Sequence, residues 1–319
     1  MTPKISIQKW LQIIVYSLVL LFFFTFLSTE RAIILHQSIP KDSSGIDSLQ
    51  MSNSNLKASF FDPAQLDVHY VKIYRNFPPI QDDQFCFLEC VALLSVLKNL
   101  QSRRVYFHSN APKFWPFSSC ASLISHGNLT SIKMMQLHPT TLIGGRSVTI
   151  LHHQADIAKL QILRDFGGVV MDMDVFIVNG QVIGRKLKQF SCVLSQEGSR
   201  MLNAGFAACR RGARWPDVML EEYRKDYRSD WYYNSAILPF KKLRDDRRLR
   251  REVYVDNTIS NNPDGKKGFK MLDMKDAVDW RGKVGFQSFY HDCNLGVAYV
   301  NHTQTGFGEL LRWILYSPL

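Results

Sequence analysis

The chain has 319 residues and a formal net charge of +11, from 39 lysines and arginines against 28 aspartates and glutamates. Its cysteines and histidines form no Cys-x-x-Cys pair and no His-x-x-x-His pair, which excludes the usual zinc-binding patterns. It contains no internal repeat and no low-complexity tract, so a repeat architecture is excluded as well.

The first predicted element is a membrane anchor at residues 10–29. This segment carries no charged residue, and it matches the roughly 20 residues that a helix needs to cross a bilayer. Because Lys4 and Lys9 precede it, the positive-inside rule places residues 1–9 in the cytosol and the rest of the chain in a lumen. The alternative is a cleaved signal peptide, but residues 26–29 make a poor cleavage site. We therefore expect a single-pass type II membrane protein.

A stem is predicted at residues 30–70, which contain the polar runs Ser43-Ser44-Gly45 and Ser52-Asn53-Ser54-Asn55 and few large apolar residues. From residue 71 onward the aromatic and β-branched content rises. Residues 71–319 are enough for one large α/β domain or two smaller ones.

Helices and strands alternate in this region, which predicts a mostly parallel sheet covered by helices on both faces. We expect helices at residues 85–100, 152–166 and 216–227. We expect strands at residues 104–108, 131–137, 147–151, 169–171, 190–194, 205–209, 284–289 and 296–301.

The predicted lumenal side holds all six cysteines, and an oxidising lumen permits disulfides. Spacing does not give their connectivity. Cys86 and Cys90 lie four residues apart on a predicted helix, so each can have a different partner. Two Asn-x-Thr sequons predict N-glycosylation at Asn128 and Asn301.

The most informative stretch is residues 163–176, which indicates a helix, a pair of glycines, a buried strand and two carboxylates. Gly167 suits the left-handed end of a helix. Asp172 and Asp174 follow the strand at its carboxyl end, where open α/β sheets bind ligands. Alternation along a strand would point both carboxylates the same way, as half of a Mg²⁺ or Mn²⁺ site completed by phosphate oxygens and water. The alternative is a solvated turn.

A basic run at residues 241–251 contributes much of the positive charge. It is typical of a solvated helical face. The functional alternative is attraction to anionic lipid headgroups or nucleotide phosphates. We expect no nucleic-acid partner for a lumenal protein.

Residues 155–175 resemble the DXD block of glycosyltransferases, most nearly the α1,4-galactosyltransferase and α1,4-N-acetylglucosaminyltransferase group (glycosyltransferase family 32-like). Weaker similarities follow in the same order as in that family, at residues 85–92, 202–208 and 299–302. Type II topology with a stem is also what this family shows. The resemblance implies a GT-A fold, a Rossmann-like and mostly parallel sheet, with retaining transfer from a UDP-sugar and Mn²⁺ (or Mg²⁺) as the metal.

The resemblance also implies roles for single residues. Asp172 and Asp174 would bind the metal and through it the diphosphate, and Asp156 would hold the ribose or the sugar of the donor. Gly167 and Gly168 match the glycine pair of the family, so we place them in the donor site.

Three further residues are candidates on their chemistry. Lys159 could contact a phosphate, and Asn203 could reach donor or acceptor hydroxyls or could simply start a turn. His302 could be a third metal ligand or a surface histidine. The sequence names no catalytic nucleophile and no acceptor base.

The chain departs from the family pattern at three places. Lys159 stands where the family usually has an arginine, which keeps the charge but loses a bidentate fork. Val169 and Val170 replace an Ile-Tyr pair. The Gly-Pro element expected after a tryptophan-rich turn is missing around residues 231–235.

The leading hypothesis is a type II glycosyltransferase of the Golgi membrane. It would transfer a hexose or N-acetylhexosamine from a UDP-sugar to a glycan on a lipid or protein, with retention and an α linkage, for which the resemblance implies the α1,4 type. One alternative is an inactive relative that binds sugar. Another is a phosphatase of the haloacid-dehalogenase type, in which Asp172 would be the nucleophile.

Overall fold

The computed structural model describes residues 66–76, 78–80, 83–100, 102–259, 280–288 and 295–317. The predicted tail and anchor, the stem up to residue 65 and Cys293 lie outside the described residues. Within the described ranges, no helix is long and apolar enough to cross a membrane.

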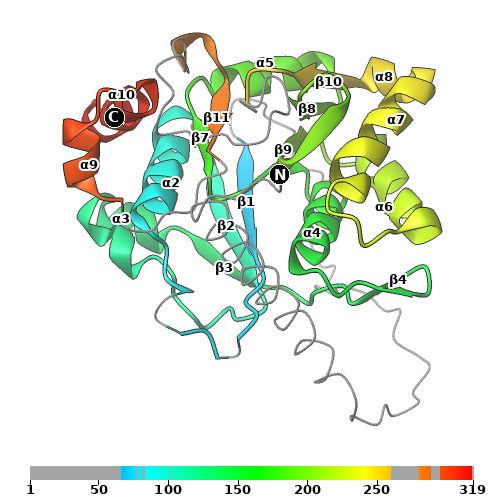
Figure 1. Cartoon of the computed structure of the whole chain (residues 1–319), viewed down its shortest axis with the longest axis horizontal. Coiled ribbons are helices and arrows are strands. Elements are labelled where there is room, and N and C mark those ends of the chain that lie inside the picture. The colour runs from blue at the N-terminus through cyan, green and yellow to red at the C-terminus, as the bar shows by residue number, and fades with distance from the viewer. Residues whose placement is uncertain are drawn as a thin grey trace, which may run out of the picture. The chain divides into compact units, whose positions relative to one another are not determined.

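A seven-stranded sheet in the order β10-β8-β9-β6-β1-β2-β3 organises the fold (Figure 1). Its strand β9 runs antiparallel to both neighbours, β6 and β8, while the other neighbouring pairs are parallel. The sheet is therefore mixed and mostly parallel, as an α/β fold requires. Its strands are β1 (Asp67–Lys72), β2 (Arg104–Ser109), β3 (Lys133–Gln136), β6 (Gly168–Met171), β8 (Cys192–Glu197), β9 (Met201–Cys209) and β10 (Val253–Asp256).

Two small antiparallel pairs accompany this sheet. The first joins β7 (Val175–Ile177) to β11 (Gly285–Gln287), and the second joins β4 (Leu142–Ile143) to β5 (Arg146–Ser147). Since β7 begins directly after the two aspartates, its pairing with β11 brings residues more than a hundred positions downstream to the end of β6.

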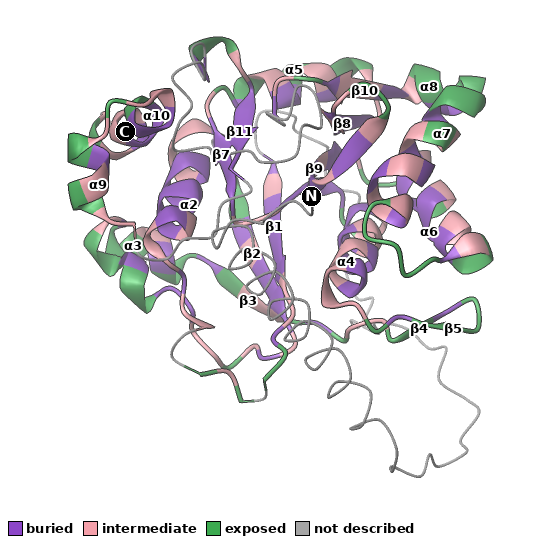
Figure 2. Cartoon of the chain, in the orientation of Figure 1, coloured by how far each residue is buried: buried purple, intermediate pink, exposed green. Residues whose placement is uncertain are grey.

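Helices cover both faces of the large sheet, because alternate side chains of its strands enter two separate apolar clusters. Val169 and Met171 of β6 belong to one cluster, and Val170 belongs to the other. The first cluster is covered by α2 (Phe87–Asn99), α5 (Gln181–Gln189) and α10 (Gly306–Tyr316). The second is covered by α4 (Leu151–Asp165), α6 (Arg214–Asp226), α7 (Leu238–Asp245) and α8 (Arg247–Glu252). Figure 2 shows the strands between them mostly buried.

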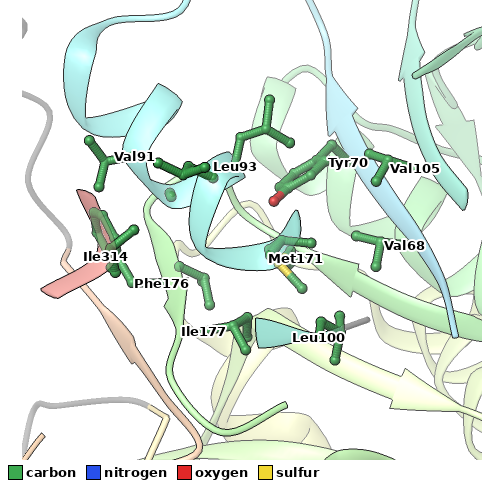
Figure 3. Packing of buried hydrophobic residues seen from close by; sticks show 14 of the residues in the cluster. Val68, Tyr70, Val91, Leu93, Leu100, Val105, Met171, Phe176, Ile177 and Ile314 are labelled. Atoms are coloured by element: carbon green, nitrogen blue, oxygen red, sulfur yellow. The ribbon is translucent and has the colours of Figure 1, made fainter. Parts of the chain in front are cut away.

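The first cluster fixes the end of β6 that carries the aspartates. Figure 3 shows Met171 of β6 and Tyr70 of β1 packed with Leu93 of α2, and Phe176 and Ile177 of β7 nearby. All five side chains are at most 1% exposed. The segment on either side of Asp172 and Asp174 is therefore anchored in the core.

The structure confirms the predicted helices that become α2, α4 and α6, and corrects three other predictions. The strand predicted at residues 296–301 is wrong: the helix α9 (Val297–His302) occupies this segment, because Val300 packs into the cluster with α10. Of the strand predicted at 147–151, β5 includes only Ser147. Val148 turns inward against Tyr227, and α4 begins at Leu151.

The third correction concerns the stem. Residues 67–70, assigned to it by composition, belong to β1, a central strand in which Val68 and Tyr70 are buried.

Two disulfides join described residues. Cys90 of α2 is bonded to Cys120, and Cys192 of β8 is bonded to Cys209, its register partner on β9. The first bond fixes a loop to α2, and the second cross-links two strands that hold one wall of the site.

Candidate active site

A cavity of about 460 Å³ opens at the carboxyl ends of β1 and β6. Its wall includes both predicted metal ligands, Asp172 and Asp174, together with Asp156, Lys159 and Asn203. Ligands of open α/β sheets bind at this edge, so the position agrees with the sequence prediction.

The two aspartates lie in a turn between β6 and β7. The amide of Asp172 donates to the carbonyl of Gly205 at 2.8 Å, and the amide of Val175 donates to the carbonyl of Asp172 at 3.2 Å. The expected alternation along a strand therefore does not apply, yet the tight turn still places both carboxylates on the cavity. The side chain of Asp172 is 40% exposed, whereas Asp174 is 6% exposed.

Asp174 is held by two residues that lie more than a hundred positions later in the sequence, Gln287 and Ser288. Nε2 of Gln287, on β11, lies 3.2 Å from Oδ1 of Asp174, and the amide of Ser288 donates to the carbonyl of Asp174 at 2.9 Å. Gly205 makes room for this contact, since a Cβ there would lie 2.4 Å from the amide group of Gln287. The lack of a side chain at residue 205 thus helps to position a predicted metal ligand.

Lys159 is a buried cation at the base of the cavity. Its Nζ lies 2.6 Å from Oδ1 of Asp172, 3.2 Å from Oδ1 of Asp156 and 3.1 Å from the carbonyl oxygen of Ala204. Burial by itself would lower the pKa of Lys159, but the two carboxylates outweigh burial and raise it. Lys159 therefore stays charged and fixes one oxygen of Asp172.

Asp156, one helical turn before Lys159 on α4, responds to the same environment. The pKa of Asp156 is raised to about 6, chiefly by burial; the charge of Lys159 opposes the shift and that of Asp172 adds to it. Its carboxylate loses its charge in mildly acidic solution more readily than an ordinary aspartate.

Asn203 lies on β9 opposite these groups and is 7% exposed. Its Oδ1 accepts from the amide of Gly205 at 2.5 Å, and its Nδ2 donates to Oε2 of Glu197 at 3.3 Å. The contact with Gly205 ties Asn203 to the segment that supports Asp172.

Three residues predicted for the donor or metal site, Gly167, Gly168 and His302, do not line the cavity. Gly167 and Gly168, with φ of 72° and 89°, join α4 to β6 at the end of the strand opposite Asp172. Their role there is to let the chain turn and to let β6 approach β1, since a Cβ on Gly168 would lie 2.5 Å from the carbonyl oxygen of Asp67. His302 and Asn301 are exposed on α9.

The other predicted glycosylation site, Asn128, lies on the short helix α3 (His126–Thr130) and is half-buried.

Among the residues that line the cavity, several were not assigned to the site by the sequence analysis. Gln287 and Glu197 come from strands far apart in the chain, and no local pattern marks them. His152 lies in the first turn of α4 and carried no signal beyond its type. Trp231 and Tyr232 stand out as exposed aromatic side chains only once the fold places them on the cavity wall.

Two carboxylates one residue apart fit a hard divalent cation such as Mg²⁺ or Mn²⁺, which usually takes one or two carboxylates plus phosphate oxygens and water. No group of three or more His, Cys, Asp or Glu side chains is arranged to hold a metal within the described ranges. The donor set is thus suited to a metal that arrives with a phosphate ligand.

No family model matches the sequence, and no curated protein matches it. Solved structures with a similar arrangement include the galactosyltransferase LgtC in complex with donor and acceptor sugar analogues. It is 13% identical, with a TM-score of 0.42 over 79% of this chain and 98% of that chain. The glycosyltransferase GlyE of Streptococcus pneumoniae TIGR4 is 11% identical, with a TM-score of 0.36 over 60% of this chain and 45% of that chain.

A 4-diphosphocytidyl-2C-methyl-D-erythritol synthase from Anaerococcus prevotii DSM 20548 is also similar, at 8% identity and a TM-score of 0.37 over 61% of this chain and 88% of that chain. Likenesses at these identities and TM-scores do not identify a reaction.

Proposed function

We propose that the chain is a metal-dependent glycosyltransferase that uses a nucleotide-diphosphate sugar, with a UDP-sugar as the expected donor. The observation that supports this most is the pair Asp172 and Asp174, which face one cavity at the carboxyl ends of parallel strands. Lys159 and Gln287 hold the two carboxylates in place.

The charge of the cavity explains why a cation is needed. Five acidic side chains line it, against two lysines. Both lysines are already paired, Lys159 as described and Lys72 with Glu89 at 3.8 Å. A diphosphate would be repelled by this wall. A divalent cation on Asp172 and Asp174 would reverse the local charge, and when bound it would stabilise the charge that develops on the leaving diphosphate.

The protein side chains have separate tasks in this scheme. Lys159 fixes Oδ1 of Asp172. Asp156 and Asn203 border the same space and offer oxygen and nitrogen atoms to the hydroxyls of a sugar or ribose. Asp174, nearly buried, presents its carboxylate from a position set by Gln287.

The setting we propose is the Golgi lumen, with a glycan on a lipid or protein as acceptor, a hexose or N-acetylhexosamine as the transferred sugar, and retention at the anomeric carbon. The apolar segment at residues 10–29 supports an anchor. The two disulfides support an oxidising compartment, because such bonds are rare in the cytosol.

The test is a screen of UDP-sugars for release of UDP by the full-length chain in detergent, with Mn²⁺ and a mixture of glycan acceptors. We expect release from one donor, loss on adding a chelator, and at least a hundredfold loss in Asp174→Asn. Tyr316→Phe, on α10, is the matched control and should keep full activity. Release that persists in the chelator would contradict the proposal.

A second candidate is a protein that binds a nucleotide sugar without transferring it. The salt bridge between Lys159 and Asp172 favours it, because the lysine already neutralises one metal ligand. Metal-dependent UDP binding with no release from any donor would select this candidate.

A further inference from the structure

Two exposed aromatic side chains line the same cavity as the aspartates. Trp231 is 57% exposed and Tyr232 is 48% exposed, and both belong to the cavity wall. Tryptophan is usually well buried, and a neighbouring pair of exposed aromatic rings in a polar cavity is typical of a binding surface.

The loop that carries these rings is held rigidly. Oδ1 of Asp230 accepts hydrogen bonds from the amides of Tyr232 and Tyr233, both at 3.0 Å. The fully buried Asn234 accepts from the amide of Arg228 at 3.0 Å and also donates to its carbonyl. The next turn is π-helical, a form that occurs often at functional sites. The aromatic surface is therefore formed before any ligand binds.

Helix α4 carries both His152, which contacts Trp231, and Lys159, which pairs with Asp172. The ring of His152 lies 3.6 Å from the ring of Trp231, centre to centre. The pKa of His152 is lowered chiefly by burial and further by His153 and Lys159, while Asp172 opposes the shift. His152, Lys159, Asp172 and Trp231 all line this one cavity.

We propose that Trp231 and Tyr232 form the subsite for the acceptor sugar, with the ring of His152 packed against Trp231. This inference rests on the proposed function. A sugar ring has an apolar face of C–H groups that packs on an aromatic ring, and hydroxyls at its edge that bond to carboxylates and amides. The cavity provides both, since Asp156, Glu197 and Asn203 lie on the same wall as the rings.

The chemistry of the wall favours a neutral sugar over other occupants. Its carboxylates repel a second anionic group, and its polar residues do not suit a lipid chain. The base of the nucleotide is the competing occupant, because a uracil ring can also stack on tryptophan. The experiment must therefore separate sugar binding from nucleotide binding.

The probes are methyl β-galactoside, methyl N-acetyl-β-glucosaminide and lactose, each added to the full-length chain in detergent with Mn²⁺ and UDP. Saturation-transfer difference NMR measures contact with the protein, and calorimetry measures the affinity for UDP. We compare the native chain with Trp231→Ala, Trp231→Phe and the control Tyr316→Ala, which removes a ring that is 59% exposed on α10.

We expect saturation transfer to at least one probe, strongest at the ring protons of one sugar face. Trp231→Ala should reduce it at least fivefold, Trp231→Phe should restore most of it, and Tyr316→Ala should leave it unchanged. The affinity for UDP should stay within twofold in all variants.

Three results would overturn the inference while leaving the proposed function intact. They are saturation transfer that persists in Trp231→Ala, a loss of UDP affinity in that variant, or no transfer to any probe while UDP binds. A native chain that fails to bind UDP with Mn²⁺ would instead contradict the proposed function itself.

Discussion

At the scale of single residues, Lys159 contributes both to the stability of the fold and to the position of the Asp172 carboxylate. It neutralises Asp172 and Asp156 at the base of the cavity, and all three groups lie on or beside α4 and β6. An uncompensated buried charge is costly, so the lysine serves the folded state even without a ligand.

Lys159→Met should therefore destabilise the chain by about 3–5 kcal/mol at pH 8, because it leaves the carboxylates without their cation. The loss should be smaller at pH 5, since Asp156, with a pKa already raised to about 6, becomes protonated there and needs no partner. Urea denaturation at the two pH values measures this. An equal loss at both would show that the charge of Asp156 is not involved.

A second pair of residues sets how the fold responds to acid. His69 of β1 and His108 of β2 are buried, with Nδ1 of His69 at 3.0 Å from Nε2 of His108. Burial lowers the pKa of His69 to about 4 and that of His108 to about 3, the latter also through the charge of His69. Both histidines are therefore neutral in the folded chain near pH 6.

Because these folded-state pKa values lie below the ordinary value, the unfolded chain binds protons first as the pH falls. Stability is complete above about pH 6.5 and should fall between pH 6 and pH 4, by about 1.4 kcal/mol per pH unit for each histidine. His69→Gln should reduce the slope of the unfolding free energy against pH by at least the contribution of one histidine, about 1.4 kcal/mol per pH unit. The exposed His302→Gln is the control, and an unchanged slope in His69→Gln would refute the assignment.

At the scale of elements, the junction between α4 and β6 is where the sequence predicts most. The apolar spacing of α4, the two glycines and the valines of β6 are all local signals, and the structure agrees with each of them. Local signals mislead where packing decides. The segment 296–301 has strand propensity but lies almost wholly in α9, and residues 67–70 have the composition of a linker but form part of β1.

The junction offers a test of why residue 168 is glycine. Gly168 and Gly212 both have positive φ, 89° and 75°, but a Cβ on Gly168 meets the carbonyl of Asp67 whereas a Cβ on Gly212 meets nothing within 4 Å. Each change to alanine should cost about 1–2 kcal/mol for the backbone conformation. Gly168→Ala should cost about 1–3 kcal/mol more, because it forces β6 away from β1. Equal losses in urea denaturation would contradict this account.

At the scale of the whole molecule, the site combines segments that are distant in sequence. Asp156, Lys159, Asp172 and Asp174 lie within twenty residues, and the sequence identifies all of them. Gln287 and Trp231 join them only through the pairing of β7 with β11 and the packing of the loop after α6. A single sequence carries no local signal for such long-range contacts, so the part of the cavity wall formed by Gln287 and Trp231 could not be predicted.

The most direct test of the central claim is calorimetric titration of UDP into the full-length chain in detergent, with and without Mn²⁺. The account predicts binding that requires Mn²⁺, is lost in Asp172→Asn and Asp174→Asn, and is kept in His302→Gln. Equal UDP affinity without Mn²⁺, or unchanged affinity in both aspartate variants, would contradict it.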